Sequence, residues 1–185
     1  MNTFNYNLFN TSLHATNNNL DHFKLLKTVY ERNLFKSENK KLLYKLINLT
    51  KDKTNLIKSQ LYQDIFALLM VGKNYDKTFL EFGATDGLEL SNTYLLENNY
   101  GWTGVLCEPS PQWHDILKKN RPNTKIVTEC IWNKSNQKLR FFVSDVGVLS
   151  TLEEFKESDK LSIPGNTKLR IEKGNLITVN TISLN

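Results

Sequence analysis

The sequence of 185 residues has few of the residues from which disulfide-linked or metal-binding proteins are built. It contains two cysteines, Cys107 and Cys130, and three scattered histidines. Neither set has the spacing of metal ligands, and two cysteines are too few for a disulfide framework. We therefore expect no metal, and we interpret both cysteines as small buried hydrophobic residues in a reducing cytoplasm.

Long apolar runs are missing as well. The longest one in the middle of the chain, residues 65–71, is far too short to cross a bilayer, so no transmembrane segment is expected. The N-terminal segment MNTFNYNLFN has neither the basic start nor the apolar core of a secretory signal. RNA-stacking motifs and an alternation of basic and aromatic residues are absent, so nucleic acid is not an expected partner.

The net charge of +5 comes from one segment of the chain. Residues 21–60 carry nine lysines and one arginine against four acids, and the rest of the chain is about neutral. A solvated helical face is the simplest explanation of this excess. A basic surface that attracts anionic lipid or polyanions is the alternative.

The apolar pattern divides the chain into three parts. Residues 1–20 contain seven asparagines and little periodicity, which predicts loop or disorder. Residues 21–58 are predicted to form a basic helical extension, because apolar side chains recur there at helical spacing. The third part, residues 59–185, begins with a helix that we expect Ser59 to cap and Gly72 to end.

From residue 78 onward the chain alternates between strand and helix. Strands are predicted at 78–82, 102–107 and 125–131, with helices at 88–98 and 111–120 between them. Short strand–helix–strand connections join parallel strands, so the fold class is α/β, with these three strands side by side in chain order. Farther along, strands predicted at 138–143, 168–171 and 176–183 are interpreted as antiparallel additions.

Two glycines and several acids follow the first predicted strand. The motif is E-x-G-x-x-x-G, with Glu81, Gly83 and Gly87, rather than the G-x-G-x-x-G of a dinucleotide site. Gly83 would let the backbone approach a ligand, and Gly87 would permit a tight turn. Because Glu81, Asp86 and Glu89 would repel a pyrophosphate, this loop suits a ligand with a cationic end, such as an ammonium or a sulfonium.

Glu108 directly follows the second predicted strand. A carboxylate at this place can accept hydrogen bonds from both hydroxyls of a ribose. A cationic end together with a ribose describes S-adenosylmethionine. Three alternatives are structural: Glu108 as a solvated strand end, Asp86 as the N-cap of the following helix, and Glu81 as a loop cap or a lysine partner.

Three further polar residues receive mainly structural interpretations. His114 falls on a predicted amphipathic helix, and we expect it at the surface rather than in a catalytic role. Asp145 and Ser150 lie in SDVGVLST, a segment that is either a structural loop or the mouth of an active site, and we favour the loop.

Three stretches of the chain resemble a known family. SQLYQDIFALL, FLEFGATDGLELSNTYLLENNYGWTGVLCEPSPQWHDILKKNR and CIWN are similar to segments of the FkbM-type methyltransferases. The resemblance runs over residues 59–185, and the SNTYLLE and GWTGVLCEP blocks make it specific. It implies a Rossmann-like class I methyltransferase fold, a three-layer sandwich, and S-adenosylmethionine as cofactor. The reaction it implies is O-methylation of a hydroxyl on a sugar, a glycan or another small metabolite.

The resemblance also implies a set of cofactor-binding residues. Glu108 would bind the ribose hydroxyls, and Cys130 would lie near the adenine. The methionine and ribose side would be lined by five residues of the first strand and the loop after it: Glu81, Gly83, Ala84, Asp86 and Gly87.

The chain departs from the family pattern at its end. Family members continue into a segment resembling IDFLKIDVEGAE, whereas this sequence ends at Asn185. That segment would pair with the strand at 78–82, so we expect a sheet that is incomplete at the C-terminus. A partner chain that supplies the missing strand, or self-association, would cover the open edge. The catalytic base is not identified, and the alternative function is a truncated or split remnant that acts as a cofactor-binding or interaction module.

Overall fold

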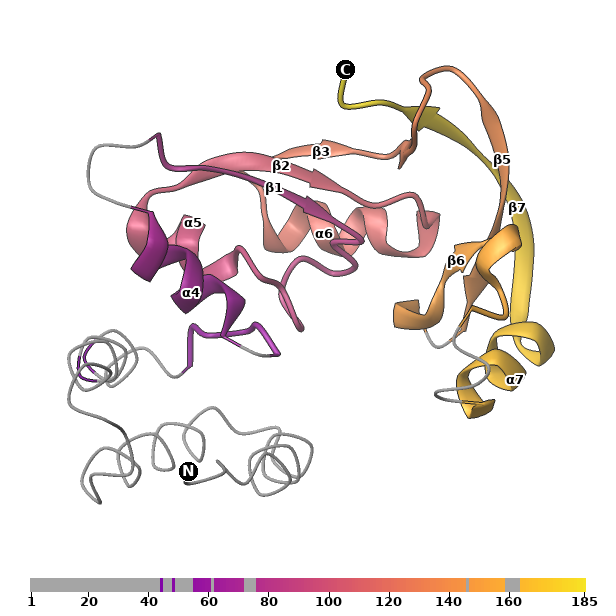
Figure 1. Ribbon diagram of the computed structural model, residues 1–185, viewed down its shortest axis with the longest axis horizontal. Coiled ribbons are helices and arrows are strands. Elements are labelled where there is room, and N and C mark those ends of the chain that lie inside the picture. The colour runs from indigo at the N-terminus through magenta and orange to yellow at the C-terminus, as the bar shows by residue number, and fades with distance from the viewer. Residues whose placement is uncertain are drawn as a thin grey trace, which may run out of the picture. The chain divides into compact units, whose positions relative to one another are not determined.

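The computed structural model describes residues 44, 48, 55–60, 62–71, 76–145, 147–158 and 164–185 (Figure 1). The predicted loop at 1–20 and most of the basic extension at 21–58 lie outside these residues. The described residues divide into two compact units, which we call the helical unit (the described residues up to Asp76, with Leu90–Gly101) and the sheet unit (the described residues of Lys77–Glu89 and Trp102–Asn185).

The helical unit contains α4 (Gln63–Met70) and α5 (Tyr94–Tyr100). Ile57, Ile65 and Leu95 are fully buried and form its core. The helix α5 begins later than predicted, so the chain from residue 83 to residue 93 is a loop. The helix α5 ends at Tyr100, and Gly101 follows as its C-cap, with a φ of 68° that is the left-handed conformation typical of this position.

The predicted cap of α4 is wrong. Ser59 lies before the N-cap position, which Tyr62 occupies without a side-chain cap. Ser59 Oγ instead donates a hydrogen bond of 2.6 Å to the buried carboxylate of Asp64. The serine therefore satisfies a buried acid in the first turn of the helix rather than a backbone N–H. Gly72, the predicted stop, lies outside the described residues.

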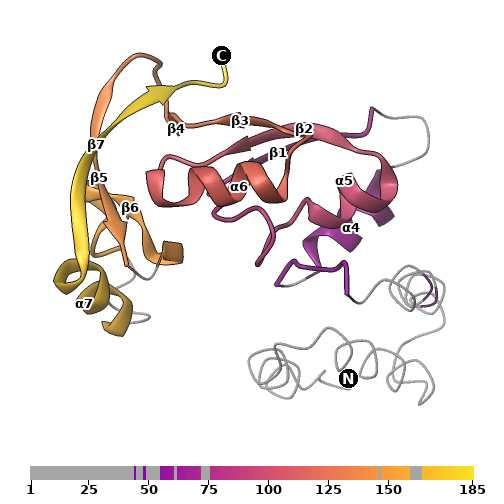
Figure 2. The ribbon, with the colours of Figure 1, turned by 180° about the vertical axis from the view of Figure 1, so that it is seen from behind.

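The sheet unit begins with three strands, β1 (Thr78–Phe82), β2 (Thr103–Cys107) and β3 (Lys125–Val127). They are parallel and in the order β1-β2-β3, which confirms the predicted arrangement. The 3-10 helix η1 (Pro111–Trp113) and α6 (His114–Asn120) connect β2 to β3. Leu117 of α6 packs against Leu106 and Ala84, so α6 covers one face of the sheet (Figures 1 and 2).

A second sheet follows in the same unit. Its order is β4-β7-β5-β6, with β4 (Cys130–Ile131) parallel to β7 (Gly174–Ile182). The strand β5 (Lys138–Ser144) runs antiparallel to β7 and to β6 (Thr151–Leu152), which confirms the antiparallel additions predicted at 138–143 and 176–183. Phe141, Leu152 and Val179 form the core of this sheet together with Cys130.

Two predicted strands differ from the structure. The strand predicted at 125–131 is two strands, β3 and β4, which belong to different sheets. The strand predicted at 168–171 is wrong, because these residues lie in α7 (Pro164–Glu172). Pro164 fits the first position of a helix, and buried Arg170 donates from Nε to the carbonyl oxygen of Leu149 over 2.6 Å. The contact with Leu149 is long-range, so a pattern of four residues could not reveal it.

The strand β1 is an edge strand in the described part of the chain, where it pairs with β2 alone. Its side chains alternate between the two faces of the sheet. Leu80 and Phe82 lie on one face and are 46% and 52% exposed. The chain is thus a mixed α/β protein whose parallel sheet has an apolar edge strand. None of its described helices has the length and apolar content to span a membrane.

Candidate functional site

The sheet unit contains a pocket of about 280 Å³ at the carboxyl ends of β1 and β2. Ligands of open α/β sheets bind at this end of the strands. We distinguish two walls by the elements that supply them. The strand-end wall consists of Phe82, Gly83, Thr85, Cys107, Glu108, Pro109, Glu129, Cys130 and Ile131. The second wall consists of Phe141, Val148, Ser150, Thr151, Leu152 and Phe155.

Gly83 joins β1 to the pocket. Its φ of +65° is a conformation that glycine adopts without steric cost, and a side chain there would meet nothing within 4 Å. The backbone N–H groups of Gly83 and Ala84 donate to the carbonyl oxygen of Cys107, at 2.8 and 3.2 Å. The loop after β1 is therefore fixed to the end of β2. Ala84 is buried in the sheet core rather than in the pocket lining.

Thr85 lies in the pocket with a strained backbone. Its φ is +48°, which is unusual for a β-branched residue. Its N–H donates to Glu108 Oε2 over 2.8 Å. This bond between the two loops supports the strained conformation, and the sequence pattern gave no sign of it.

Asp86 and Gly87 have structural roles outside the pocket lining. Asp86 Oδ1 accepts from the N–H groups of Leu88 and Glu89, at 2.9 and 2.8 Å. The aspartate thus caps a turn of the loop, whereas the predicted role as N-cap of the next helix is wrong because α5 begins at Tyr94. A Cβ on Gly87 would lie 2.5 Å from Leu117 Cδ1, so the glycine permits close packing against α6.

Glu81 lies in β1 and is 8% exposed. Strand alternation places it on the same face as Phe79, opposite to Phe82. It does not belong to the pocket lining. Of the seven predicted cofactor residues, the structure therefore brings three together in the pocket, namely Gly83, Glu108 and Cys130.

Glu108 is the centre of the strand-end wall. It is 3% exposed, so the alternative of a solvated strand end is wrong. Its two carboxylate oxygens accept from the N–H groups of Thr85 and Ser110, each at 2.8 Å. Burial raises the pKa of Glu108, while the two N–H groups and His114 oppose that rise. His114, which we expected at the surface, is half-buried, and its Nε2 lies 2.8 Å from the backbone oxygen of Glu108.

Glu129 is a pocket residue that the sequence analysis missed. It lies in the break between β3 and β4, which was predicted as one continuous strand. No local signal marked it, because Glu129 follows the end of a strand only once the break between β3 and β4 is known. The pocket therefore holds two carboxylates, and no lysine, arginine or histidine is found among its described lining residues.

Both cysteines line the pocket as free thiols. Burial raises the pKa of Cys107, with a smaller contribution from Glu129, and burial likewise raises the pKa of Cys130, with a contribution from Glu108. Both thiols therefore stay protonated at neutral pH and are poor nucleophiles. They contribute apolar, polarisable surface to the pocket, as expected for small buried hydrophobic residues.

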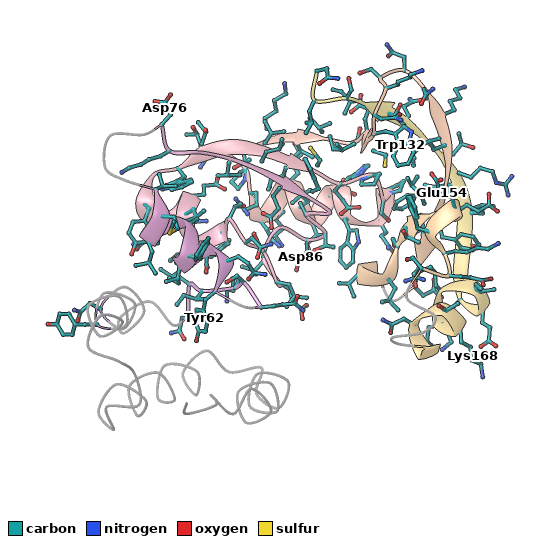
Figure 3. All side chains as sticks on the ribbon, in the orientation of Figure 1. Tyr62, Asp76, Asp86, Trp132, Glu154 and Lys168 are labelled. Atoms are coloured by element: carbon teal, nitrogen blue, oxygen red, sulfur yellow. The ribbon has the colours of Figure 1, made fainter. Side chains whose placement is uncertain are left out.

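The second wall comes from β5 and from the segment 147–155, which includes η2 (Gly147–Leu149) and η3 (Glu153–Phe155). Ser150 lines the pocket, and its Oγ also accepts from the N–H of Ser144 over 3.1 Å, so its position is compatible with both interpretations. The ring centres of Phe155 and Trp132 lie 6.3 Å apart. Figure 3 labels Trp132 and also Glu154, which precedes Phe155 in the chain. Gln112 Nε2 donates to the oxygen of Ser144 over 3.1 Å and so ties η1 to β5.

This arrangement suits an uncharged or cationic ligand with hydroxyl groups. Its carboxylates can accept hydrogen bonds and attract a positive charge, but they repel phosphates. In the described residues, no three His, Cys, Asp or Glu side chains gather as a metal site would require. No family model, curated protein or solved structure matches this chain, so its resemblance to the FkbM-type methyltransferases stays a prediction.

Proposed function

We propose that the pocket binds S-adenosylmethionine and that the chain is an O-methyltransferase of the FkbM type, with a Rossmann-like class I fold. The observation that carries the proposal is the position of Glu108. Its buried carboxylate lines a pocket at the carboxyl ends of parallel strands, beside Gly83 at the end of β1. The acceptor would be a hydroxyl of a sugar, a glycan or another small metabolite.

The residues of the pocket fit the cofactor chemically. Each oxygen of Glu108 accepts one backbone N–H, and a carboxylate oxygen can accept a second hydrogen bond. Two ribose hydroxyls can therefore donate to the same carboxylate. The charges of Glu108 and Glu129 favour a sulfonium over a phosphate, and the volume of 280 Å³ is near the lower end for small-molecule sites.

The bound cofactor would supply an electrophilic methyl group. The chain's own contribution is positional: Glu108 would orient the ribose, and the loop fixed by Gly83 and Thr85 would hold the cofactor beside the acceptor. Apolar residues of the second wall would exclude water from the transfer. The free thiols of Cys107 and Cys130 are compatible with work in the cytoplasm.

A second candidate function is a binding or interaction module without turnover. The exposed apolar edge strand β1 favours it, because such an edge can pair with another chain. Both candidate functions require that the pocket bind the cofactor. An assay of methyl transfer to an acceptor therefore distinguishes the enzyme from the binding module.

Calorimetric titration with S-adenosylmethionine and with its demethylated product tests the proposal. Glu108→Gln removes the charge and one acceptor, and we expect at least tenfold weaker binding, because a hydrogen bond to a charged group contributes about 1.5–3 kcal/mol. The matched control is Glu154→Gln, an exposed glutamate of η3 outside the pocket lining, which should bind as the wild type does. The absence of binding to the folded wild-type chain, or equal binding by Glu108→Gln, would overturn the proposal.

A further inference from the structure

Three large apolar side chains of the pocket remain exposed. Phe82 is 52% exposed, Val148 57% and Phe155 43%, and all three line the same pocket. They come from different elements, namely β1, η2 and η3. Single exposed apolar residues are common on proteins, but a group around a pocket indicates a binding surface. We call Phe82, Val148 and Phe155 the apolar rim.

The second wall carries no charge. Its polar members are the hydroxyl residues Ser150 and Thr151, and the others are apolar. The two carboxylates of the pocket belong to the strand-end wall. The pocket is therefore divided into a part that suits a hydroxylated or cationic group and a part that suits an uncharged apolar group.

We propose that the apolar rim binds an aromatic or alicyclic ring of the methyl acceptor, and that the acceptor is an uncharged hydroxyl compound. This inference rests on the proposed function, because it assigns the polar residues of the strand-end wall to the cofactor and the apolar rim, Phe82 included, to the acceptor. A ring on Phe82, Val148 and Phe155 would remove exposed apolar surface from water. An anionic acceptor, such as an acidic glycan, would be repelled by Glu108 and Glu129.

Three glycosides form a matched set of probes. Phenyl β-glucoside and methyl β-glucoside have the same sugar and differ in the ring, and phenyl β-glucuronide adds one negative charge. Their dissociation constants are measured by NMR titration of the full chain, in the presence of saturating S-adenosylhomocysteine. We expect the phenyl glucoside to bind at least tenfold tighter than both the methyl glucoside and the glucuronide.

Variants of the rim identify the surface that makes this difference. Val148→Ser combined with Phe155→Ser should reduce the preference for the phenyl ring to less than threefold. The control is Phe66→Ser, because Phe66 lies in α4, outside the pocket lining, and is 63% exposed. Since Phe155 contacts Trp132, the double variant could unfold, so Val148→Ser alone is the second variant, with an expected loss of about threefold in preference.

Equal binding of the phenyl and methyl glucosides, or a preference that survives in Val148→Ser and the double variant, would overturn the inference. A loss of S-adenosylhomocysteine binding in folded Val148→Ser would also overturn it, because the rim would then belong to the cofactor. If the wild type binds S-adenosylhomocysteine but shows no preference for the ring, this inference fails and the proposed function stands. If it prefers the phenyl ring but binds no S-adenosylhomocysteine, the proposed function fails and the rim remains an apolar binding surface.

Discussion

At the scale of single residues, Glu108 connects the two loops that build the pocket. Its carboxylate accepts from Thr85 in the loop after β1 and from Ser110 in the loop after β2. Both bonds are at least partly buried, so water cannot fully replace the carboxylate. The same residue that we propose to hold the ribose therefore also stabilises the fold around it.

Replacement of Glu108 by alanine leaves both N–H donors without their acceptor. We expect Glu108→Ala to lower the free energy of unfolding by about 2–6 kcal/mol, because each of the two donors left without an acceptor costs about 1–3 kcal/mol. Urea denaturation measures this change. The control is Glu154→Ala, a substitution at an exposed residue. A loss equal to that of the control would show that the carboxylate does not hold the loops.

The buried carboxylate also gives stability a pH dependence. Because burial raises the folded-state pKa of Glu108, the folded protein binds this proton more tightly than the unfolded chain does. The contribution of Glu108 to stability is then fully present below the unfolded pKa of about 4.3, and it is lost as the pH rises through the folded pKa. Relative to Glu108→Gln, which cannot titrate, the wild type should gain stability as the pH falls from 7 to 4. Urea denaturation across this range measures the difference, and a wild type that gains stability toward pH 7 would show that the pKa is lowered.

Thr85 offers a substitution that relieves strain. A positive φ in a β-branched residue costs about 1–3 kcal/mol, whereas glycine adopts it freely at a cost of about 1 kcal/mol in chain entropy. We expect Thr85→Gly to be as stable as the wild type or up to about 2 kcal/mol more stable. Thr128→Gly, at an exposed threonine that is not among the positive-φ residues, should be less stable than the wild type. Thermal unfolding compares the two variants, and a Thr85→Gly chain less stable than Thr128→Gly would contradict the assignment of strain.

At the scale of elements, α6 holds the loop after β1 in place. Asn120 Nδ2 donates to the oxygen of Asp86 over 2.8 Å, and Arg121 Nη1 donates to the oxygen of Gly87 over 3.0 Å. Arg121 is 1% exposed and its guanidinium lies 5.6 Å from the centre of the Phe79 ring. The loop after β1 therefore packs tightly against the end of α6.

The packing at Gly87 makes any side chain there costly. A Cβ would lie 2.5 Å from Leu117 and 2.7 Å from Arg121, in a backbone with φ of +74°. We expect Gly87→Ala to lower the free energy of unfolding by more than about 2 kcal/mol. In Gly165→Ala, a helical control in α7 where a Cβ meets nothing within 4 Å, stability should rise by about 0.5–1 kcal/mol. Chemical denaturation measures both, and equal effects would show that the loop gives way to the methyl group.

Local patterns predicted some elements and not others. The strand at 78–82 has the predicted bounds, because apolar residues and flanking turn residues both mark it. The break between β3 and β4 was not predictable from periodicity, since β4 pairs with the distant strand β7. The helix α7 was missed for a similar reason, because Arg170 contacts Leu149 and Lys156 across the fold.

The same limit applies to the candidate site. Glu108 was found because a carboxylate at the end of a strand is a local signal. Thr85 was not, because its role depends on φ and on a bond between two loops. Val148 and Phe155 flank β6, which pairs with the preceding strand β5, and they line the same pocket as the ends of β1 and β2, which lie far away in the sequence.

At the scale of the whole molecule, we expect the edge strand β1 to govern association. Its exposed Leu80 and Phe82 stand beside an edge that pairs with no strand in the described residues. We expect the wild type to self-associate with rising concentration, and Leu80→Lys to shift it toward the monomer, because a charge blocks pairing at a strand edge. Ile116→Lys is the control, at an apolar residue of α6 with 42% exposure. Sedimentation velocity measures the effect, and a wild type that stays monomeric at all concentrations would contradict it.

In the proposed function, the pocket of the sheet unit holds S-adenosylmethionine through Glu108. A crystal structure of the chain grown with saturating S-adenosylhomocysteine tests this claim most directly. We expect density for the nucleoside in this pocket, with both ribose hydroxyls about 2.5–3.0 Å from the carboxylate oxygens of Glu108. Density for the nucleoside at any other place, or a pocket without it at saturating concentration, would contradict the claim.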